Sequence, residues 1–354
     1  MFGLVMFLIF IILVLVIIYL FKKVLKIVSL TKINNKLLTY LISIIPFLLL
    51  FILFNRVNFV VIILHLFIFI SLSSLIFRLI NKKYLLSSLP VIVGICVTIV
   101  YLGFGTYLDY HIKETVYNIT TNKNIDGNFK ILQITDTHVG TTFDGNGFRK
   151  YIEKISKKEA DIVVITGDFV DDDTSREDMI ISCEALSLFK PKYGVYFIYG
   201  NHDKGYFNYR NFNSNDLVKE LEKNNVIVLK DEVKQVNDYI YLVGREDKTY
   251  QRKDIKELVR DIDKSKYIID LNHQPNDYEK EKNNVDLVLS GHTHGGQLFP
   301  LGYIGLLTHQ NDEFYGLHKR GNTNFIVNSG MSDWAIDFKT GTSSEYVIIN
   351  IHGE

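Results

Sequence analysis

The chain has 354 residues, of which 47% are hydrophobic, with 39 Lys and Arg against 39 Asp and Glu. This apolar content excludes a disordered chain, and two cysteines exclude a disulfide-rich scaffold. The charge is unevenly divided, because residues 1–110 carry nine basic residues and one acidic residue, which leaves 30 basic and 38 acidic residues after position 110. The acidic second part argues against a nucleic-acid partner, since binding to backbone phosphates needs a basic surface.

Four apolar stretches without Lys, Arg, Asp or Glu occupy the first part, at residues 2–21, 37–54, 59–77 and 85–108. Each is close to the roughly 20 residues that a helix needs to cross a bilayer. A cleaved signal peptide would begin with basic residues, whereas here the basic residues follow the first stretch. The sequence therefore predicts a retained four-helix transmembrane anchor over residues 1–108.

The loops between these stretches differ in charge. Eight basic residues lie in or beside the first and third loops: Lys22, Lys23, Lys26, Lys32, Lys36, Arg78, Lys82 and Lys83. The second loop holds only Arg56. Because basic loops remain in the cytoplasm, we expect a multi-pass cell-membrane protein whose residues after 110 are extracytoplasmic.

The second part begins with polar residues of mixed charge at 109–128, which predict a linker. Segments rich in β-branched residues then predict strands at 130–135, 161–166, 195–199, 226–229, 239–243, 267–271, 286–290, 325–328 and 346–351. Apolar residues at helical spacing predict helices at 148–158, 176–189, 217–223 and 255–261. This alternation favours an α/β domain over residues 129–354.

Polar clusters follow five of the predicted strands. They are Asp136-Thr-His138, Gly-Asp168-Phe-Val-Asp171, Gly-Asn201-His202-Asp203, Asn-His273 and Gly-His292-Thr-His294. Ligands bind at the carboxyl ends of strands in open α/β sheets. If the extended conformation continues past the strand, Asp136 and His138 point in the same direction because side chains alternate along a strand.

Mixed imidazole, carboxylate and amide ligands favour Mn, Fe, Zn or Co over an all-oxygen Mg or Ca site. The number of candidate ligands indicates two divalent metal ions, an arrangement that suits phosphoryl transfer. Each cluster alone has a simpler explanation; Asp168 after a glycine, for example, is a common turn residue. Five clusters in order, each at a strand end, argue instead for a metal centre.

The order Asp-x-His, Gly-Asp-x-x-Asp, Gly-Asn-His-Asp, His, Gly-His-x-His resembles the calcineurin-like metallophosphoesterase superfamily. The ending Gly-His-Thr-His-Gly-Gly-Gln is similar to that of its membrane-anchored bacterial branch. The resemblance covers residues 130–351. It implies a four-layer α-β-β-α sandwich of two mixed sheets with a dinuclear metal site.

The resemblance also implies a role for each residue that matches by position. One metal would be held by Asp136, His138 and His294, the other by Asn201, His273 and His292, with Asp168 bridging the two. His202 would stand next to the leaving group, oriented by Asp203, and Asp171 would hydrogen-bond a ligand.

The implied function is hydrolysis of a phosphoester by a metal-bridging hydroxide, with a phosphodiester or a lipid-linked phosphate or pyrophosphate favoured. The alternatives are a non-catalytic membrane sensor that binds a phosphorylated ligand, a phosphomonoesterase acting on a soluble substrate, and a transporter. The intact ligand set argues against the sensor, and the scarcity of polar residues in the four stretches argues against the transporter. The sequence contains no Gly-x-Ser-x-Gly, P-loop or Cys-x-x-Cys motif.

Two apolar or aromatic segments leave the candidate site, at residues 206–212 and 298–307. If they line a groove beside the metals, the substrate is amphiphilic; if they pack in the core, its class stays open. Arg245 also has two interpretations, a phosphate-binding residue or a solvated residue at a strand end.

Overall fold

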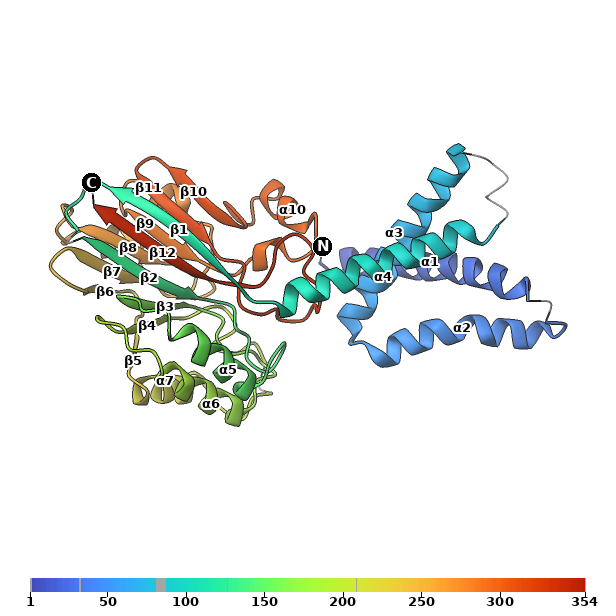
Figure 1. The fold of residues 1–354 in the computed structure, drawn as a ribbon, viewed down its shortest axis with the longest axis horizontal. Helices are drawn as coiled ribbons and strands as arrows, with labels where there is room; N and C mark the ends of the chain where they lie inside the picture. Colours follow the sequence, from blue (N-terminus) through green and yellow to red (C-terminus); the bar gives the residue numbers. More distant parts are fainter. Residues whose placement is uncertain (1, 32, 81–86, 126, 208, 354) are drawn as a thin grey trace. The chain divides into compact units, whose positions relative to one another are not determined.

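The computed structural model describes residues 2–31, 33–80, 87–125, 127–207 and 209–353 (Figure 1). The chain divides into two compact units, residues 1–105 and residues 106–354. Lys32, Lys82 and Lys83 of the basic loops, and the start of the fourth predicted span, lie outside the described residues.

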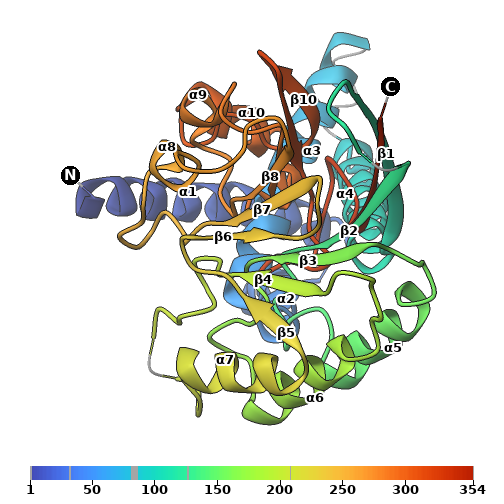
Figure 2. The ribbon, with the colours of Figure 1, turned by 90° about the vertical axis from the view of Figure 1, so that its left-hand side faces the viewer.

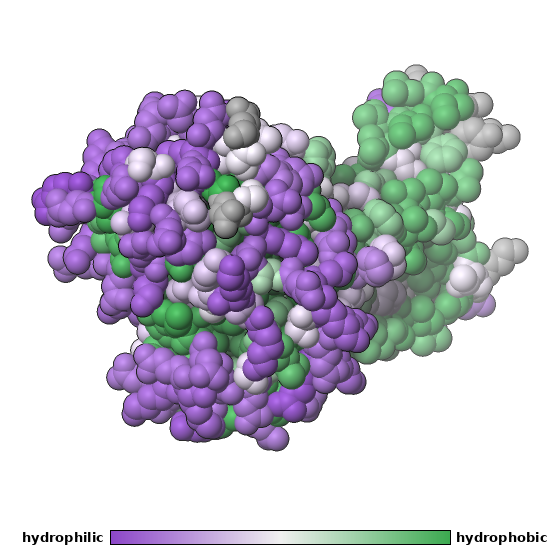
Figure 3. Space-filling view, turned by 60° about the vertical axis from the view of Figure 1, so that its left-hand side comes forward, coloured by the Kyte–Doolittle hydropathy of each residue, from purple (hydrophilic) through white to green (hydrophobic). Residues whose placement is uncertain are grey.

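The first unit consists of long apolar helices. They are α1 (Phe2–Ser29), α2 (Lys36–Leu53), α3 (Arg56–Ile80) and α4 (Leu89–Tyr110), whose last residues belong to the second unit. They supply four candidate membrane spans of 23, 18, 25 and 22 residues. Figure 3 shows hydrophobic residues over most of their visible surface, in contrast to the largely hydrophilic surface of the other unit. Helices that are apolar over most of their circumference are stable in a bilayer, so this is a membrane protein.

The second unit contains two mixed six-stranded sheets. The first has the order β1 (Lys113–Thr121), β12 (Glu345–Gly353), β2 (Asn128–Ile134), β3 (Ile162–Thr166), β4 (Val195–Ile198), β5 (Val226–Val228). The second has the order β10 (Gly316–Arg320), β11 (Thr323–Val327), β9 (Leu287–Ser290), β8 (Tyr267–Leu271), β7 (Ile240–Gly244), β6 (Glu232–Gln235). The strands β2, β3, β4 and β5 run parallel, as do β7, β8, β9 and β11, so the carboxyl ends of each group share one edge.

Apolar side chains on both faces of the sheets build four layers. Ile131 of β2 packs between the sheets with Ile269 of β8 and Leu289 of β9. Its neighbour Leu132 points to the other face and packs with Phe148, as the alternation along a strand requires. The outer helices on that face are α5 (Gly145–Ile155), α6 (Arg176–Leu186) and α7 (Ser214–Lys223); α8 (Ile255–Leu258) and α9 (Tyr278–Glu281) cover the second sheet. Figure 2 shows the two sets of helices on opposite sides, which confirms the predicted α-β-β-α sandwich.

The predicted linker is wrong over residues 113–121, which form β1 and pair in parallel with β12. Strands β6 and β10 were also not predicted. All three lie at the edge of a sheet. An edge strand exposes about half of its side chains, so it tolerates polar residues and lacks the continuous apolar run that identifies a central strand.

Candidate metal centre

The loops that follow β2, β3, β4, β8 and β9 bring the predicted ligands together at the carboxyl ends of both sheets. Three groups of side chains have ligand atoms within 4.8 Å of one another: Asp136 with His138 and His294, His138 with Asp171 and His202, and Asp168 with His273 and His292. His138 belongs to the first two groups, and its Nε2 lies 3.7 Å from Oδ2 of Asp168 in the third, so the three groups form one continuous cluster.

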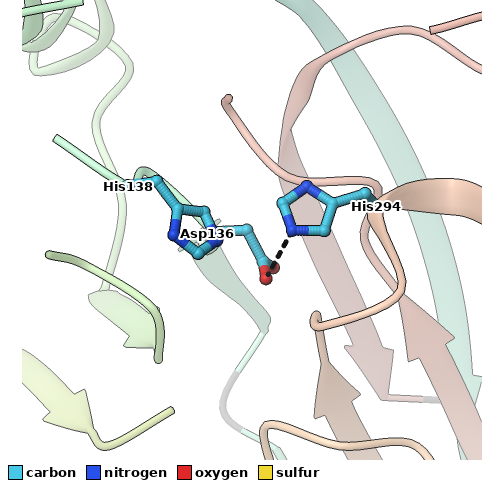
Figure 4. Close-up of side chains that lie close together, drawn as sticks. All are labelled: Asp136, His138 and His294. Carbon is cyan, nitrogen blue, oxygen red and sulfur yellow. Dashed lines mark ion pairs between the residues drawn. The ribbon is translucent and has the colours of Figure 1, made fainter. Parts of the chain in front are cut away.

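The first group is shown in Figure 4. Nε2 of His294 lies 3.6 Å from Oδ1 of Asp136, and the rings of His138 and His294 stack with centroids 5.1 Å apart. Both oxygens of Asp136 accept the backbone N–H of His292 at 3.0 Å, and Oδ2 also accepts the hydroxyl of Thr135 at 2.7 Å. The carboxylate is therefore fixed by the loops of two different strands.

Three histidines are oriented by hydrogen bonds from the same ring nitrogen. Nδ1 of His138 donates to Oδ2 of Asp171 at 2.9 Å, Nδ1 of His273 to the carbonyl of Thr166 at 2.8 Å, and Nδ1 of His294 to the carbonyl of Ser332 at 3.0 Å. This pattern assigns the proton to Nδ1 and leaves Nε2 available to a metal. Nε2 of His138 is buried and has no hydrogen-bond partner among the described residues, as expected of a metal ligand.

Asp168 lies between the two halves of the cluster. Its Oδ2 is 3.1 Å from Nε2 of His273 and 3.7 Å from Nε2 of His138. Burial raises the pKa of Asp168, but the imidazoles of His273 and His138 outweigh burial and hold this pKa well below its usual value. Burial and the neighbouring His273 lower the pKa of His292 to about 4, so His292 is neutral and able to ligate.

Asn201 completes the set, with Oδ1 3.2 Å from Nε2 of His273. The seven predicted ligands therefore lie in one cluster of carboxylate, imidazole and amide groups. That donor set fits transition-metal ions better than Mg²⁺ or Ca²⁺.

The sequence-based expectation for Asp203 is wrong. Its buried carboxylate accepts the backbone N–H groups of Asp168, Phe169, Val170 and Gly200 at 2.7 to 3.2 Å. Asp203 thus fixes the loop that carries Asp168 instead of orienting His202. The two residues follow each other in a tight turn, and their side chains have different partners.

His202 is held by Asp171. Nδ1 of His202 lies 3.2 Å from Oδ1 of Asp171, whose other oxygen accepts the hydrogen bond from His138. Asp171 therefore hydrogen-bonds the predicted ligand His138, as expected, and also holds His202. Burial lowers the pKa of His202, but the hydrogen bond to Asp171 and the charge of Asp168 outweigh burial and raise this pKa above its usual value.

The backbone of the site departs from extended geometry. Asp136, His138, Asp168, His292 and His294 have φ between 37° and 71°. The expected strand alternation at Asp136 and His138 is therefore wrong, although both side chains do reach the cluster. Gly167 is required here, because a Cβ at this position would lie 2.6 Å from the backbone of Gly200 and 2.7 Å from Nδ1 of His273.

Sequence reasoning missed Asp333. Its Oδ1 lies 3.2 Å from Nδ1 of His294 and 3.4 Å from Nζ of the buried Lys339, and its Oδ2 accepts Nε2 of Gln297 at 2.6 Å. The available signal was the polar run Asn328-Ser-Gly-Met-Ser-Asp333, which follows β11 as the other clusters follow their strands.

Arg245 does not face the cluster as a phosphate-binding residue. It is fully buried and forms ion pairs with Glu281 at 2.9 Å and Asp277 at 3.1 Å. These carboxylates neutralise its charge inside the second sheet's outer layer, so its role is structural.

Comparison with known proteins points to one family. A model described as calcineurin-like phosphoesterase matches residues 129–296. An uncharacterized metallophosphoesterase of Campylobacter jejuni is 31% identical over 239 residues, which are 65% of this chain and 61% of that protein. Another from Aquifex aeolicus is 29% identical over 265 residues, 72% of this chain and 98% of that protein.

A zebrafish (Danio rerio) transmembrane protein with a metallophosphoesterase domain is 28% identical over 233 residues, 61% of this chain and 51% of that protein. The chain thus spans less than two thirds of the length of the Campylobacter and zebrafish relatives. The matched region contains the seven clustered ligands, and the two mixed sheets have the architecture that the family implies. Residues 129–296 of this chain are therefore a metallophosphoesterase domain of the calcineurin-like family.

Proposed function

We propose that the domain hydrolyses a phosphoester with two divalent metal ions, held by Asp136, His138, Asp168, Asn201, His273, His292 and His294. The observation that carries this proposal is the position of Asp168, whose carboxylate lies within 3.7 Å of a histidine from each half of the cluster. Bound metals would supply Lewis acidity, which ionises water near neutral pH and offsets the charge of the phosphoryl group.

The side chains of this chain would position the groups and move the proton. Attack by a water-derived oxygen forms one P–O bond and breaks the bond to the leaving oxygen, which must gain a proton. Because Nδ1 of His202 is held by Asp171, Nε2 of His202 is the atom that would donate it. Asp203 would act indirectly, by fixing the loop of Asp168.

The favoured substrate is an amphiphilic phosphoester such as a phosphodiester lipid or a lipid-linked phosphate or pyrophosphate. A groove of about 170 Å³ begins at Gly295 and Gly296, beside His294, and its apolar lining includes Leu298, Phe299, Tyr303, Phe314 and Tyr315. On the other flank, Tyr206 packs against His202 with ring centroids 5.0 Å apart. An acyl or isoprenoid chain in the groove would bind by apolar burial.

The same proposal places the domain at the outer face of the cell membrane, anchored by α1 to α4. Its support is the excess of basic residues in the first and third loops, together with the apolar character of the four helices.

The test is to purify the full chain in detergent, load it with Mn²⁺, and assay a panel of phosphomonoesters, phosphodiesters and lipid pyrophosphates. Turnover that is lost on chelation and restored by metal supports a metal-dependent phosphoesterase. Two bound metals without turnover on any member of the panel would instead indicate a binding module.

A further inference from the structure

Helix α10 (Leu301–Leu307) has an unusual distribution of side chains. Its sequence, Leu-Gly-Tyr-Ile-Gly-Leu-Leu, contains no charged residue, and none of its seven residues, all described, is buried. Leu301 is 46% exposed, Ile304 48% and Leu307 79%. A helix on a water-soluble domain normally turns its large apolar side chains to the core. Helix α10 turns them to the outside.

Gly302 makes the contact with the domain instead. A Cβ added to Gly302 would lie 2.6 Å from the ring of Phe314, so the backbone of α10 packs directly on that ring. A Cβ added to Gly296 would lie 2.7 Å from Cα of Gly302, so Gly296 also has no room for a side chain. Tyr303 packs edge-on against Phe314 with centroids 5.1 Å apart. The side with Gly302 is therefore the inner one, and Leu301, Ile304 and Leu307 are left on the outer side.

The surroundings of α10 in the sequence are also free of charge. No Lys, Arg, Asp or Glu occurs from Gly295 to Asn311, and Phe299, just before the helix, is 62% exposed. The helix ends in a hydrogen bond from the N–H of Thr308 to the carbonyl of Ile304 at 3.0 Å. An uncharged helical turn with its backbone bonded internally is able to enter the bilayer interface without burying a charge.

This segment lies close to the residues at which α4 ends. Tyr315, which lines the groove beside α10, accepts a hydrogen bond from Nζ of Lys113 at 3.4 Å. Lys113 is the third residue after Tyr110, the last residue of α4. In addition, the N–H of Ser344 donates to the carbonyl of Leu108 at 3.0 Å, and Ser344 follows Thr342 of the groove by two residues. The apolar surface is thus next to the end of the last candidate span.

We propose that α10 and Phe299 form a second membrane contact, in which Phe299, Leu301, Ile304 and Leu307 insert into the interface of the bilayer that the four N-terminal helices cross. The bilayer is the occupant proposed here because α4, the last candidate span, ends at Tyr110, a few residues from Lys113, which contacts Tyr315 of the groove. Insertion would hold the groove that begins beside His294 at the lipid surface. This contact goes beyond the proposed hydrolysis and does not depend on it.

The contact would be apolar and not electrostatic. The segment carries no charge, and the part of the chain after residue 110 has 30 basic and 38 acidic residues. We therefore expect insertion into zwitterionic lipid, with no requirement for anionic lipid and little effect of ionic strength.

The experiment uses the full chain reconstituted in phosphatidylcholine vesicles, with Cys96 and Cys183 replaced by alanine. A single cysteine replaces the exposed Thr308 and carries a bimane fluorophore. Phosphatidylcholine brominated in the upper part of its acyl chains serves as the quencher. In the matched control, a single cysteine with the same fluorophore replaces Leu188, which lies beyond the end of α6 and is 41% exposed. We expect strong quenching at position 308 and little at position 188, unchanged between low and high salt.

The variant L301S/I304S/L307S, with the probe at 308, tests the cause, and its metal content verifies that the site remains folded. Loss of most of the quenching in this variant supports insertion by the apolar side chains. Equal quenching at positions 308 and 188, or full quenching in the serine variant, would overturn the proposal. The proposal would also be overturned if the probe at position 308 were shielded from aqueous iodide but not quenched by the brominated lipid. Shielding that increases with protein density would mean that a second copy of the chain covers α10. No readout involves turnover, so the result stands apart from the test of phosphoesterase activity.

Discussion

Asp171 holds His202 in place, with Oδ1 of the carboxylate 3.2 Å from Nδ1 of the imidazole. Asp203, which directly follows His202 in the chain, accepts hydrogen bonds from backbone amides instead. The orientation of the proposed proton donor is therefore tied to the same carboxylate that orients His138. A change at Asp171 is expected to disturb proton donation and one metal ligand together.

We predict that Asp171→Asn lowers kcat by about 10- to 100-fold, as losses of partners that orient metal ligands do. An amide offers one acceptor oxygen where the carboxylate offers two, so it is unable to hold both imidazoles. The measurement is kcat and metal content side by side, with the exposed Asp173→Asn as the control. Unchanged kcat in Asp171→Asn would show that this contact has no role in catalysis.

Replacing His202 by alanine should slow turnover by on the order of 10² to 10⁴-fold while two metals remain bound. His202 contacts Asp171, which hydrogen-bonds the predicted ligand His138, and His202 is not itself a predicted ligand. Rates are compared for a poor and a good leaving group, since only the poor one needs protonation. An equal loss on both substrates would contradict a role as general acid.

Asp168→Asn should abolish detectable turnover, a loss of about 10³-fold or more, because a neutral amide does not bridge two dications as a carboxylate does. Elemental analysis should show fewer than two metals per chain. The backbone N–H of His202 still finds an acceptor at position 168, so the circular dichroism spectrum of the variant should match that of the wild type. Full activity in this variant would refute the assignment of the metal centre.

Asp333→Asn is expected to weaken metal binding by about 10- to 100-fold, because the carboxylate lies 3.2 Å from Nδ1 of His294 and 3.4 Å from Nζ of the buried Lys339, whose charge the amide would leave unpaired. Metal titration of the full chain measures this affinity directly. Asp261→Asn, at a side chain that is 81% exposed, is the matched control. If both variants bind metal as the wild type does, Asp333 does not position His294 for binding.

The topology is tested at Asn122, an exposed residue directly after β1. A cysteine placed there, in the background without Cys96 and Cys183, should react with a membrane-impermeant thiol reagent in intact cells if the domain is extracytoplasmic. Labelling that requires permeabilised cells would reverse the orientation and place the substrate in the cytoplasm.

The sequence alone determined the features that depend on local composition. Four charge-free stretches identify the four apolar helices, and runs of β-branched residues identify the central strands, with β8 at 267–271 as predicted. The residues that cluster as candidate ligands were also predicted, because each lies in the loop after a buried strand and the order of the motifs is specific. These elements can be predicted without knowledge of tertiary contacts, because a central strand or a membrane span is apolar along its whole length.

Only the tertiary structure decided which side chains become partners. The edge strand β1 looked like a linker until its pairing with β12 was known, since an edge strand shares its polar character with loops. Asp171 and not Asp203 holds His202, because the Asp203 carboxylate accepts four backbone N–H groups of the loops that follow β3 and β4. Asp333 and His294 are 39 positions apart, and α10 exposes its leucines because Gly302 packs on Phe314. Such contacts join segments distant in sequence, and their geometry is fixed by packing, which composition and spacing do not encode.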